Sequence, residues 1–191
     1  MRALKALLAV LMLLVAFPAA AEVRVTFYSH PWGAGGDGQY PHAFIRVTGQ
    51  PAWAPAPIDE TYGFTTKQQA LVFFKARGLV EGARPDYVAR STPYFWVEIS
   101  DDEYRTLREW IDTWNRPPGS DYNLYHRNCI VFVADLAQSL GLTVGDTKTL
   151  DPDIFMADLK RLNATRVAEG LAPPVGSSGS AVASLTSAGA P

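Results

Sequence analysis

Apolar and polar side chains alternate in the first third of the chain. The segment 22–28 contains VRVTFY, in which β-branched and apolar residues recur at every second position, a pattern typical of a strand. HAFIRVTG, over His42–Gly49, alternates in the same way and places His42 on the face opposite to Ala43. A third strand is expected over Ile58–Phe64, beyond a proline-rich connection that does not suit an interior strand.

Helical spacing takes over after these strands. Thr65 or Thr66 can cap a helix that ends at Gly78, with apolar positions at Ala70, Leu71, Phe73 and Phe74. YFWVEI then predicts a fourth strand. Ser100, with Glu103 three residues later, is a capping box that begins a second helix, whose apolar stripe is Leu107, Trp110, Ile111 and Trp114.

Two further helices are predicted in the last third of the chain. One begins near Cys129, with Asn128 as its cap, and ends at Gly141. A weaker one starts around Pro152, with Asp151 as its cap. The elements together predict a single domain over residues 22–165.

The two ends of the chain are not expected to belong to that domain. Arg2 and Lys5 precede a short apolar run that ends in small residues, which indicates a signal peptide over residues 1–21 with cleavage after Ala21. The run is too short for a good membrane span, so export to the periplasm or the outside is expected. Residues 166–191 become rich in Ala, Gly, Ser and Pro, which predicts a disordered tail.

Composition narrows the function classes. The chain has 191 residues, with 17 Lys and Arg against 19 Asp and Glu, so a nucleic-acid partner is not expected. One cysteine, Cys129, allows neither an internal disulfide nor a thiolate zinc cage, and the three histidines lack the paired spacing of metal ligands. No metal and no cofactor are therefore expected.

Cys129 is the residue most open to a chemical role. At a helix N-terminus, unpaired N–H groups and the helix dipole favour an anion, which predicts a lowered thiol pKa and a reactive thiolate. The alternative is a small buried apolar residue. His42, at the start of a strand, is the candidate base, whereas His30 and His126 are interpreted as loop or surface histidines. Glu60 or Thr61, on the next strand, would orient His42.

The order of these residues resembles a known family. HAFIRVTG around His42, TYGF around Tyr62 and YNLYHRNCIVFVADLAQSLGL around Cys129 are similar to motifs of the circularly permuted, NlpC-like branch of papain-fold cysteine hydrolases, which includes lecithin retinol acyltransferase-like enzymes. The resemblance spans about Val23–Leu142. It implies an α+β, papain-like fold, in which a small antiparallel sheet packs against helices, including the helix of Cys129.

The resemblance also implies roles for individual residues. Cys129 would be the nucleophile, His42 the base, and the backbone N–H of Cys129 an oxyanion donor. Acyltransferase-type relatives often carry a second histidine as the third residue, and here no histidine follows His42 before His126. The third residue therefore stays open between Glu60 and Thr61.

Three functions follow as alternatives. The first is an exported cysteine peptidase or amidase that cleaves an amide bond in cell-wall peptides through an acyl-thioester on Cys129. The second is a lipid acyl hydrolase or acyltransferase acting on phospholipid, which exposed aromatics at Trp32, Tyr40 and Trp53 would favour. The third is a secreted binding module, which predicts a buried, inert Cys129 without a base. The sequence does not specify the oligomeric state.

Overall fold

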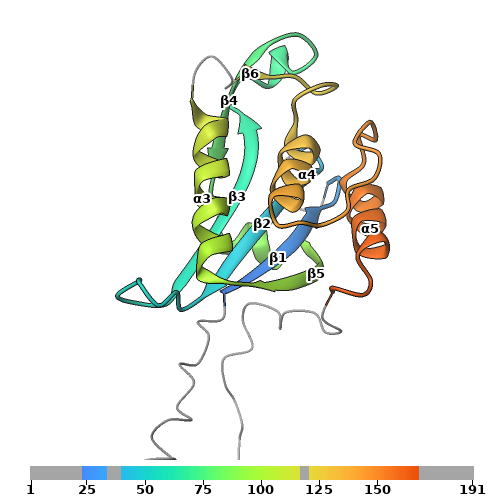
Figure 1. Ribbon diagram of the computed structural model, residues 1–191. Helices are drawn as coiled ribbons and strands as arrows, with labels where there is room; N and C mark the ends of the chain where they lie inside the picture. The colour runs from blue at the N-terminus through green and yellow to red at the C-terminus, as the bar shows by residue number, and fades with distance from the viewer. Residues whose placement is uncertain (1–22, 34–39, 117–120, 168–191) are drawn as a thin grey trace, which may run out of the picture.

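The computed structural model describes residues 23–33, 40–116 and 121–167 of the chain. These residues form an α+β fold in which four helices surround a six-stranded antiparallel sheet with strand order β5-β1-β2-β3-β4-β6 (Figure 1). The strands are β1 (Val23–His30), β2 (His42–Gly49), β3 (Ile58–Thr66), β4 (Ala76–Glu81), β5 (Thr92–Ile99) and β6 (Asp121–Tyr122). The helices are α2 (Pro85–Ala89), α3 (Asp101–Asn115), α4 (Cys129–Ser139) and α5 (Pro152–Leu162), with a short 3₁₀ turn, η1 (Gln69–Leu71).

The sheet divides near the start of β2. β1 pairs with β2 along its whole length, from Val23↔Gly49 to His30↔His42. The pairing of β2 with β3 covers a shorter stretch and reaches Ile45↔Tyr62. From Gly63 onward β3 pairs with β4, so β3 diverges from β2 and continues as part of a second ribbon. The first residues of β2 lie at this division.

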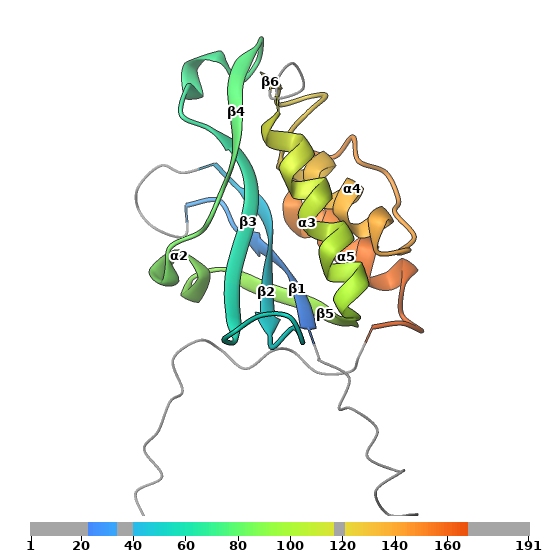
Figure 2. The same cartoon turned by 60° about the vertical axis from the view of Figure 1, so that its left-hand side comes forward.

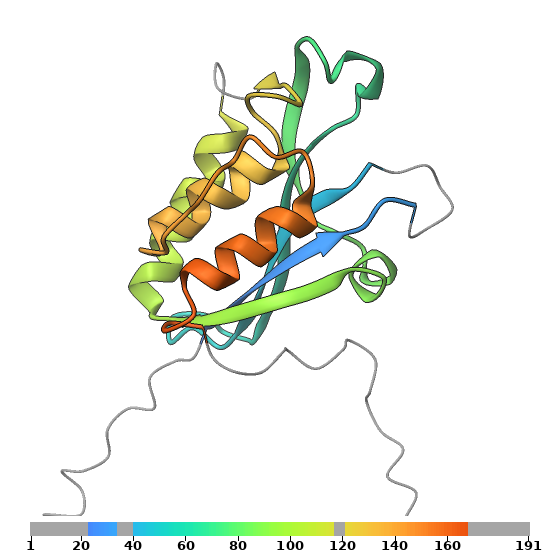
Figure 3. The ribbon, with the colours of Figure 1, turned by 90° about the vertical axis from the view of Figure 1, so that its right-hand side faces the viewer.

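The two faces of the sheet are covered unequally. Figure 2 shows α3, α4 and α5 on one face and the short α2 on the other. The alternation of β2 is confirmed, because Ala43 packs into the main core under α3, α4 and α5, whereas Phe44 belongs to a small cluster with Tyr28 and Val88 on the α2 face. α5 packs on β1 and α4 on β2 and β3, and the two helices lie side by side in Figure 3.

The helix starts predicted from capping residues are confirmed. Ser100 and Glu103 form the reciprocal capping box of α3, Asn128 caps α4 by accepting from the N–H groups of Ile130 and Val131, and Asp151 caps α5. The stripe of α3 differs at one position. Leu107, Ile111 and Trp114 are buried, whereas Trp110 is exposed and Tyr104 takes the fourth buried place.

The helix predicted between Thr66 and Gly78 is wrong. This segment contains the single turn η1 and then β4, whose Leu79 pairs with Thr65 of β3. Thr66 Oγ1 accepts from the N–H of Gln68, and the side chain of Gln68 accepts from the N–H of Arg77. These local bonds close a tight turn, and pairing with β3 outweighs the helical spacing of the apolar residues.

Several predictions concern the chain ends. The signal peptide over residues 1–21, its cleavage after Ala21 and most of the predicted tail lie outside the described residues. Arg166, the first residue of the predicted tail, donates to the carbonyl of Leu140 and to Glu103. Among the described residues, no helix has both the length and the apolar character needed to cross a membrane.

Candidate functional site

Cys129 is the first residue of α4, at the end of the helix that faces β2. Its side chain is buried, with 6% exposure. Asn128 takes up the N–H groups of Ile130 and Val131 through its side chain and that of Phe132 through its carbonyl. The cap thus uses three of the first N–H groups of the helix, and the N–H of Cys129 is the one that it does not use.

The pKa predicted for Cys129 was wrong in direction. Burial raises the pKa of the thiol to about 11. Main-chain N–H groups of Ala43, Cys129 and Ile130 interact with the sulfur and oppose this rise without cancelling it. The helix N-terminus favours a thiolate as expected, but the loss of hydration costs the thiolate more. At neutral pH, Cys129 is therefore a protonated thiol.

His42 is the first residue of β2 and shares a cavity with Cys129. The cavity has a volume of about 530 Å³, and both residues line it together with Asn128 and Tyr122. Burial is the main cause that lowers the pKa of His42 to about 4, with a further lowering from nearby His30 and an opposing effect of Glu81. His42 is therefore a neutral imidazole near pH 7, the form that accepts a proton.

The two residues reach this cavity from opposite faces of the sheet. The ring of His42 lies on the α2 face, stacked on Phe44 with ring centroids 6.2 Å apart, while Cys129 packs on the other face. Ala43, the neighbour of His42, directs its N–H toward the sulfur of Cys129, just beyond the last β2–β3 pair at Ile45. The division of the sheet therefore opens the edge of β2 where α4 begins.

His30 is the cross-strand partner of His42, and its interpretation as a loop histidine was wrong. It ends β1, is 1% exposed and pairs directly with His42 in the β1–β2 register. Its Nδ1 lies 2.9 Å from Ser91 Oγ, which itself donates to the carbonyl of Tyr87. Since the single hydroxyl proton of Ser91 is used in that bond, Nδ1 of His30 is the donor to Ser91 Oγ. His126 is exposed, as expected.

Gly63 makes room for the His42 ring. A Cβ at this position would lie 2.4 Å from Nε2 of His42 and 3.1 Å from Cβ of Phe44. The imidazole thus rests against the backbone of β3 at a point where any other residue would displace it. The TYGF segment, which contains Gly63, was recognised in the sequence. The strand pattern does not predict which histidine packs against this glycine.

The two predicted orienters of His42 are not brought to it. The carboxylate of Glu60 accepts from Tyr62, Tyr104 and Arg108, on the face covered by α3. Thr61 lies opposite Arg46, four residues along β2 from His42, and its hydroxyl bonds to the backbone of Ala83. Neither residue lines the cavity, because the alternation of β3 and its register against β2 direct them elsewhere.

The predicted exposed aromatics divide into two groups. Trp32 and Tyr40 are 70% and 40% exposed and both line the cavity beside His42. Trp53 is also exposed but stacks on Tyr104 of α3, at the connection that follows β2. The cavity wall also contains Arg84 and the ion pair of Lys67 with Glu81, so it combines aromatic surface with charged groups of both signs.

The pH dependence of the free energy of unfolding should reveal the lowered pKa of His42. The pKa is 6.5 for an ordinary histidine and about 4 here, so the unfolded chain binds this proton more tightly, and stability present above pH 6.5 is lost as the pH falls to about 4. We expect a loss of up to about 3 kcal/mol from this group. Urea unfolding of the wild type and His42→Gln near pH 7 and near pH 4 measures it as the difference between the two proteins. Equal pH dependence in both would contradict the lowered pKa.

The comparisons with known proteins add no relative. No family model, no curated protein and no solved structure matches this chain. Within the described part of the chain, no group of three or more His, Cys, Asp or Glu side chains is placed to hold a metal ion.

Proposed function

We propose that this protein is an exported cysteine hydrolase that opens an acyl bond through a thioester on Cys129. The observation that carries the proposal is one cavity lined by Cys129, at a helix N-terminus, and by His42, at the start of the strand whose Ala43 N–H contacts the sulfur. A nucleophile, a base and main-chain donors are the parts that acyl transfer requires.

The fold assignment that we propose with this function is a permuted papain-like domain. Its support is the order of the parts: an antiparallel sheet that carries the histidine comes first, and the helix that begins at Cys129 packs on it later in the chain. This is the arrangement implied by the resemblance to NlpC-like hydrolases.

The chemistry begins from two neutral groups. His42 takes the thiol proton as the sulfur of Cys129 attacks the substrate carbonyl, and the carbonyl oxygen gains the negative charge. The N–H of Cys129, left unused by the helix cap, and the N–H of Ala43 both interact with the sulfur and would stabilise this charge. As the C–N bond breaks, His42 returns the proton to the leaving amine, and water then hydrolyses the thioester to a carboxylic acid and the free thiol.

His30 is the third residue in this proposal. It is buried beside His42, and its Nδ1 is fixed by the bond to Ser91. His30 pairs with His42 across the two strands and helps to lower its pKa, so it would favour the neutral form of the neighbouring imidazole. The second histidine of acyltransferase-type relatives therefore has a counterpart on the strand before His42 and not after it.

The proposed substrate is an amide in a cell-wall peptide, since export would bring the protein to that polymer. Arg84 in the cavity wall, beside the ion pair of Lys67 with Glu81, suits a free carboxylate of such a peptide. Phospholipid is the second candidate, because the exposed Trp32 and Tyr40 beside His42 offer apolar contact to an acyl chain.

Mass spectrometry of the intact protein separates these candidates. The processed protein and its Cys129→Ala variant are each incubated with purified cell-wall peptides and with phospholipid vesicles. We expect cleaved peptides and a transient adduct on Cys129 whose mass equals that of the acyl part of the peptide. A fatty-acyl adduct on Cys129 would instead indicate that the substrate is a lipid.

The binding-module alternative makes a different prediction for the same experiment. It agrees with the burial of Cys129 but not with the presence of His42 in the same cavity. An absence of products and adducts with every substrate offered would favour that alternative, whereas products that form equally with wild type and Cys129→Ala would contradict a thiol hydrolase.

A further inference from the structure

An exposed group of apolar side chains lies at one end of the sheet. Leu71, Phe73, Phe74 and Tyr125 are 42%, 49%, 75% and 53% exposed, and we call them the apolar tip. Leu71, Phe73 and Phe74 come from the connection between β3 and β4, and Tyr125 from the one between β6 and α4. Figures 1 and 3 show the β3–β4 connection projecting at the end of the molecule opposite to the start of β1.

The tip is held by its own backbone. The N–H of Leu124 donates to the carbonyl of Val72 at 2.7 Å, and the side-chain amide of Asn123 donates to the carbonyl of Phe74. Val72 is 4% exposed and anchors the connection in the core. Because Val72 points inward, its neighbours in the chain point outward. The exposed rings therefore belong to a turn that hydrogen bonds hold in place.

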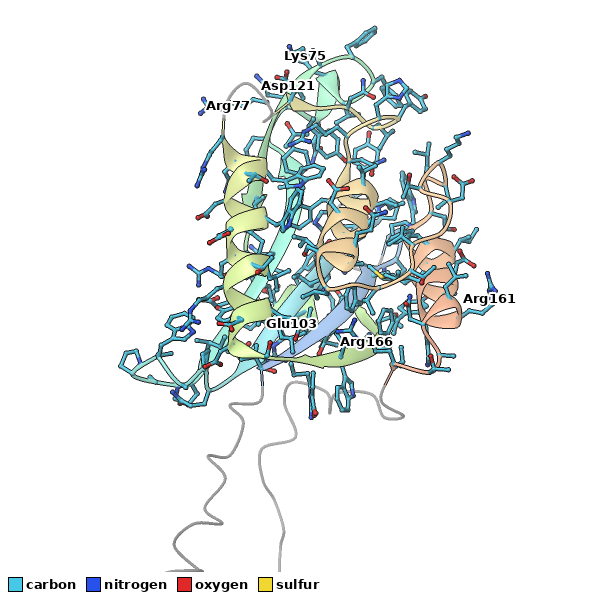
Figure 4. All side chains as sticks on the ribbon, in the orientation of Figure 1. Lys75, Arg77, Glu103, Asp121, Arg161 and Arg166 are labelled. Atoms are coloured by element: carbon cyan, nitrogen blue, oxygen red, sulfur yellow. The ribbon has the colours of Figure 1, made fainter. Side chains whose placement is uncertain are left out.

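Positive charge exceeds negative charge beside the tip. Segments 66–77 and 121–128 contain four Lys or Arg and one Asp, although the whole chain has 17 Lys and Arg against 19 Asp and Glu. Lys67 pairs with Glu81 of β4 and Lys75 pairs with Asp121, and Figure 4 shows Lys75, Arg77 and Asp121 at this end. Apolar side chains with an excess of cations beside them match the acyl boundary and the anionic headgroups of a bilayer surface.

We propose that the apolar tip docks this protein on the surface of an anionic phospholipid membrane. Stable contacts between proteins use about 20 to 30 residues a side, whereas the tip offers four apolar side chains at a projecting end, a shape suited to shallow insertion. Val72 and Leu124, which hold the tip, also line the cavity of Cys129. Docking would therefore bring that cavity next to the membrane, whatever reaction occurs in it.

Vesicle sedimentation tests the docking directly. The processed protein is mixed with vesicles of phosphatidylcholine and phosphatidylglycerol, and with vesicles of phosphatidylcholine alone. We expect the double variant Phe73→Ser, Phe74→Ser to bind the anionic vesicles at least about tenfold more weakly than the wild type. Lys75→Glu with Arg77→Glu should reduce binding severalfold on anionic vesicles and have little effect on neutral ones.

Controls keep this test independent of catalysis and of folding. Ile154→Ser removes an apolar side chain that is 61% exposed on α5 and should leave binding unchanged, as should Cys129→Ala. A Phe74→Trp variant retains the apolar tip and should show added fluorescence quenching by brominated lipids. Equal binding by wild type and the double serine variant, or no added quenching, overturns the proposal. Self-association of the wild type that the serine variant abolishes, without vesicle binding, would also overturn it.

Discussion

Replacing Cys129 by alanine should lower the hydrolysis of an activated ester, such as p-nitrophenyl acetate, by about 10⁴- to 10⁶-fold. The sulfur is the one atom in the cavity on which the proposed thioester can form. His42→Ala should cost a comparable factor, because a thiol whose pKa is about 11 attacks only if a base removes its proton. The double variant should be no slower than either single variant, since the two groups act as a unit.

The same experiment has a control inside the chain. His126 is exposed and lies three residues before Cys129, so His126→Ala should retain full activity. Thermal unfolding of His126→Ala should change little, because its imidazole is exposed, and the unfolding curves of Cys129→Ala and His42→Ala check that both proteins are folded at the assay temperature. A Cys129→Ala protein that retains wild-type activity would contradict the proposed nucleophile.

Gly63→Ala should reduce the same activity by about 10²-fold through the position of His42. The new methyl group would lie 2.4 Å from Nε2 of the imidazole, closer than nonbonded atoms approach, so the ring must move. A displacement of about 1 Å at a proton-transferring group is enough for a loss of this size. Steady-state kinetics measure the loss as a fall in kcat.

Gly82→Ala is the matched control for this glycine. Both glycines line the cavity, but a Cβ at position 82 meets its nearest neighbour, the carbonyl of Thr61, at 3.4 Å, an ordinary contact. We expect Gly82→Ala to keep its activity. In a His42→Ala background, Gly63→Ala should cost nothing further, because the ring that it displaces is gone. A further loss there would mean that Gly63 acts on the fold and not through His42.

The elements that sequence patterns predicted well are those with a local physical cause. Alternation placed β1, β2 and β3, and capping residues such as Ser100 and Asn128 marked the helix starts. The helix predicted after Thr66 was wrong because this segment pairs with β3, and a local stretch of sequence does not contain that partner strand. The burial predicted for Trp110 was wrong for a related reason. The position of the sheet relative to α3 buries Tyr104 in its place.

The candidate site was predicted in part for the same reason. Cys129 and His42 were found from element positions, since each begins a helix or a strand. The partners of His42 required the register: His30 lies opposite it through β1–β2 pairing, and Gly63 lies beneath its ring, whereas Glu60 and Thr61 are directed elsewhere. The sign of the thiol pKa required burial, which a helix cap does not reveal.

The unbroken eight-residue pairing of β1 with β2 links the chemistry of this protein to its core. Ala43, Ile45 and Val47 fill the main core, so sliding β2 by one position would expose all three and turn His42 to the wrong face. Selection for a stable core therefore also holds the imidazole in place. For the hydrolase that we propose, the strand pairing that fills the core is therefore also what positions the base.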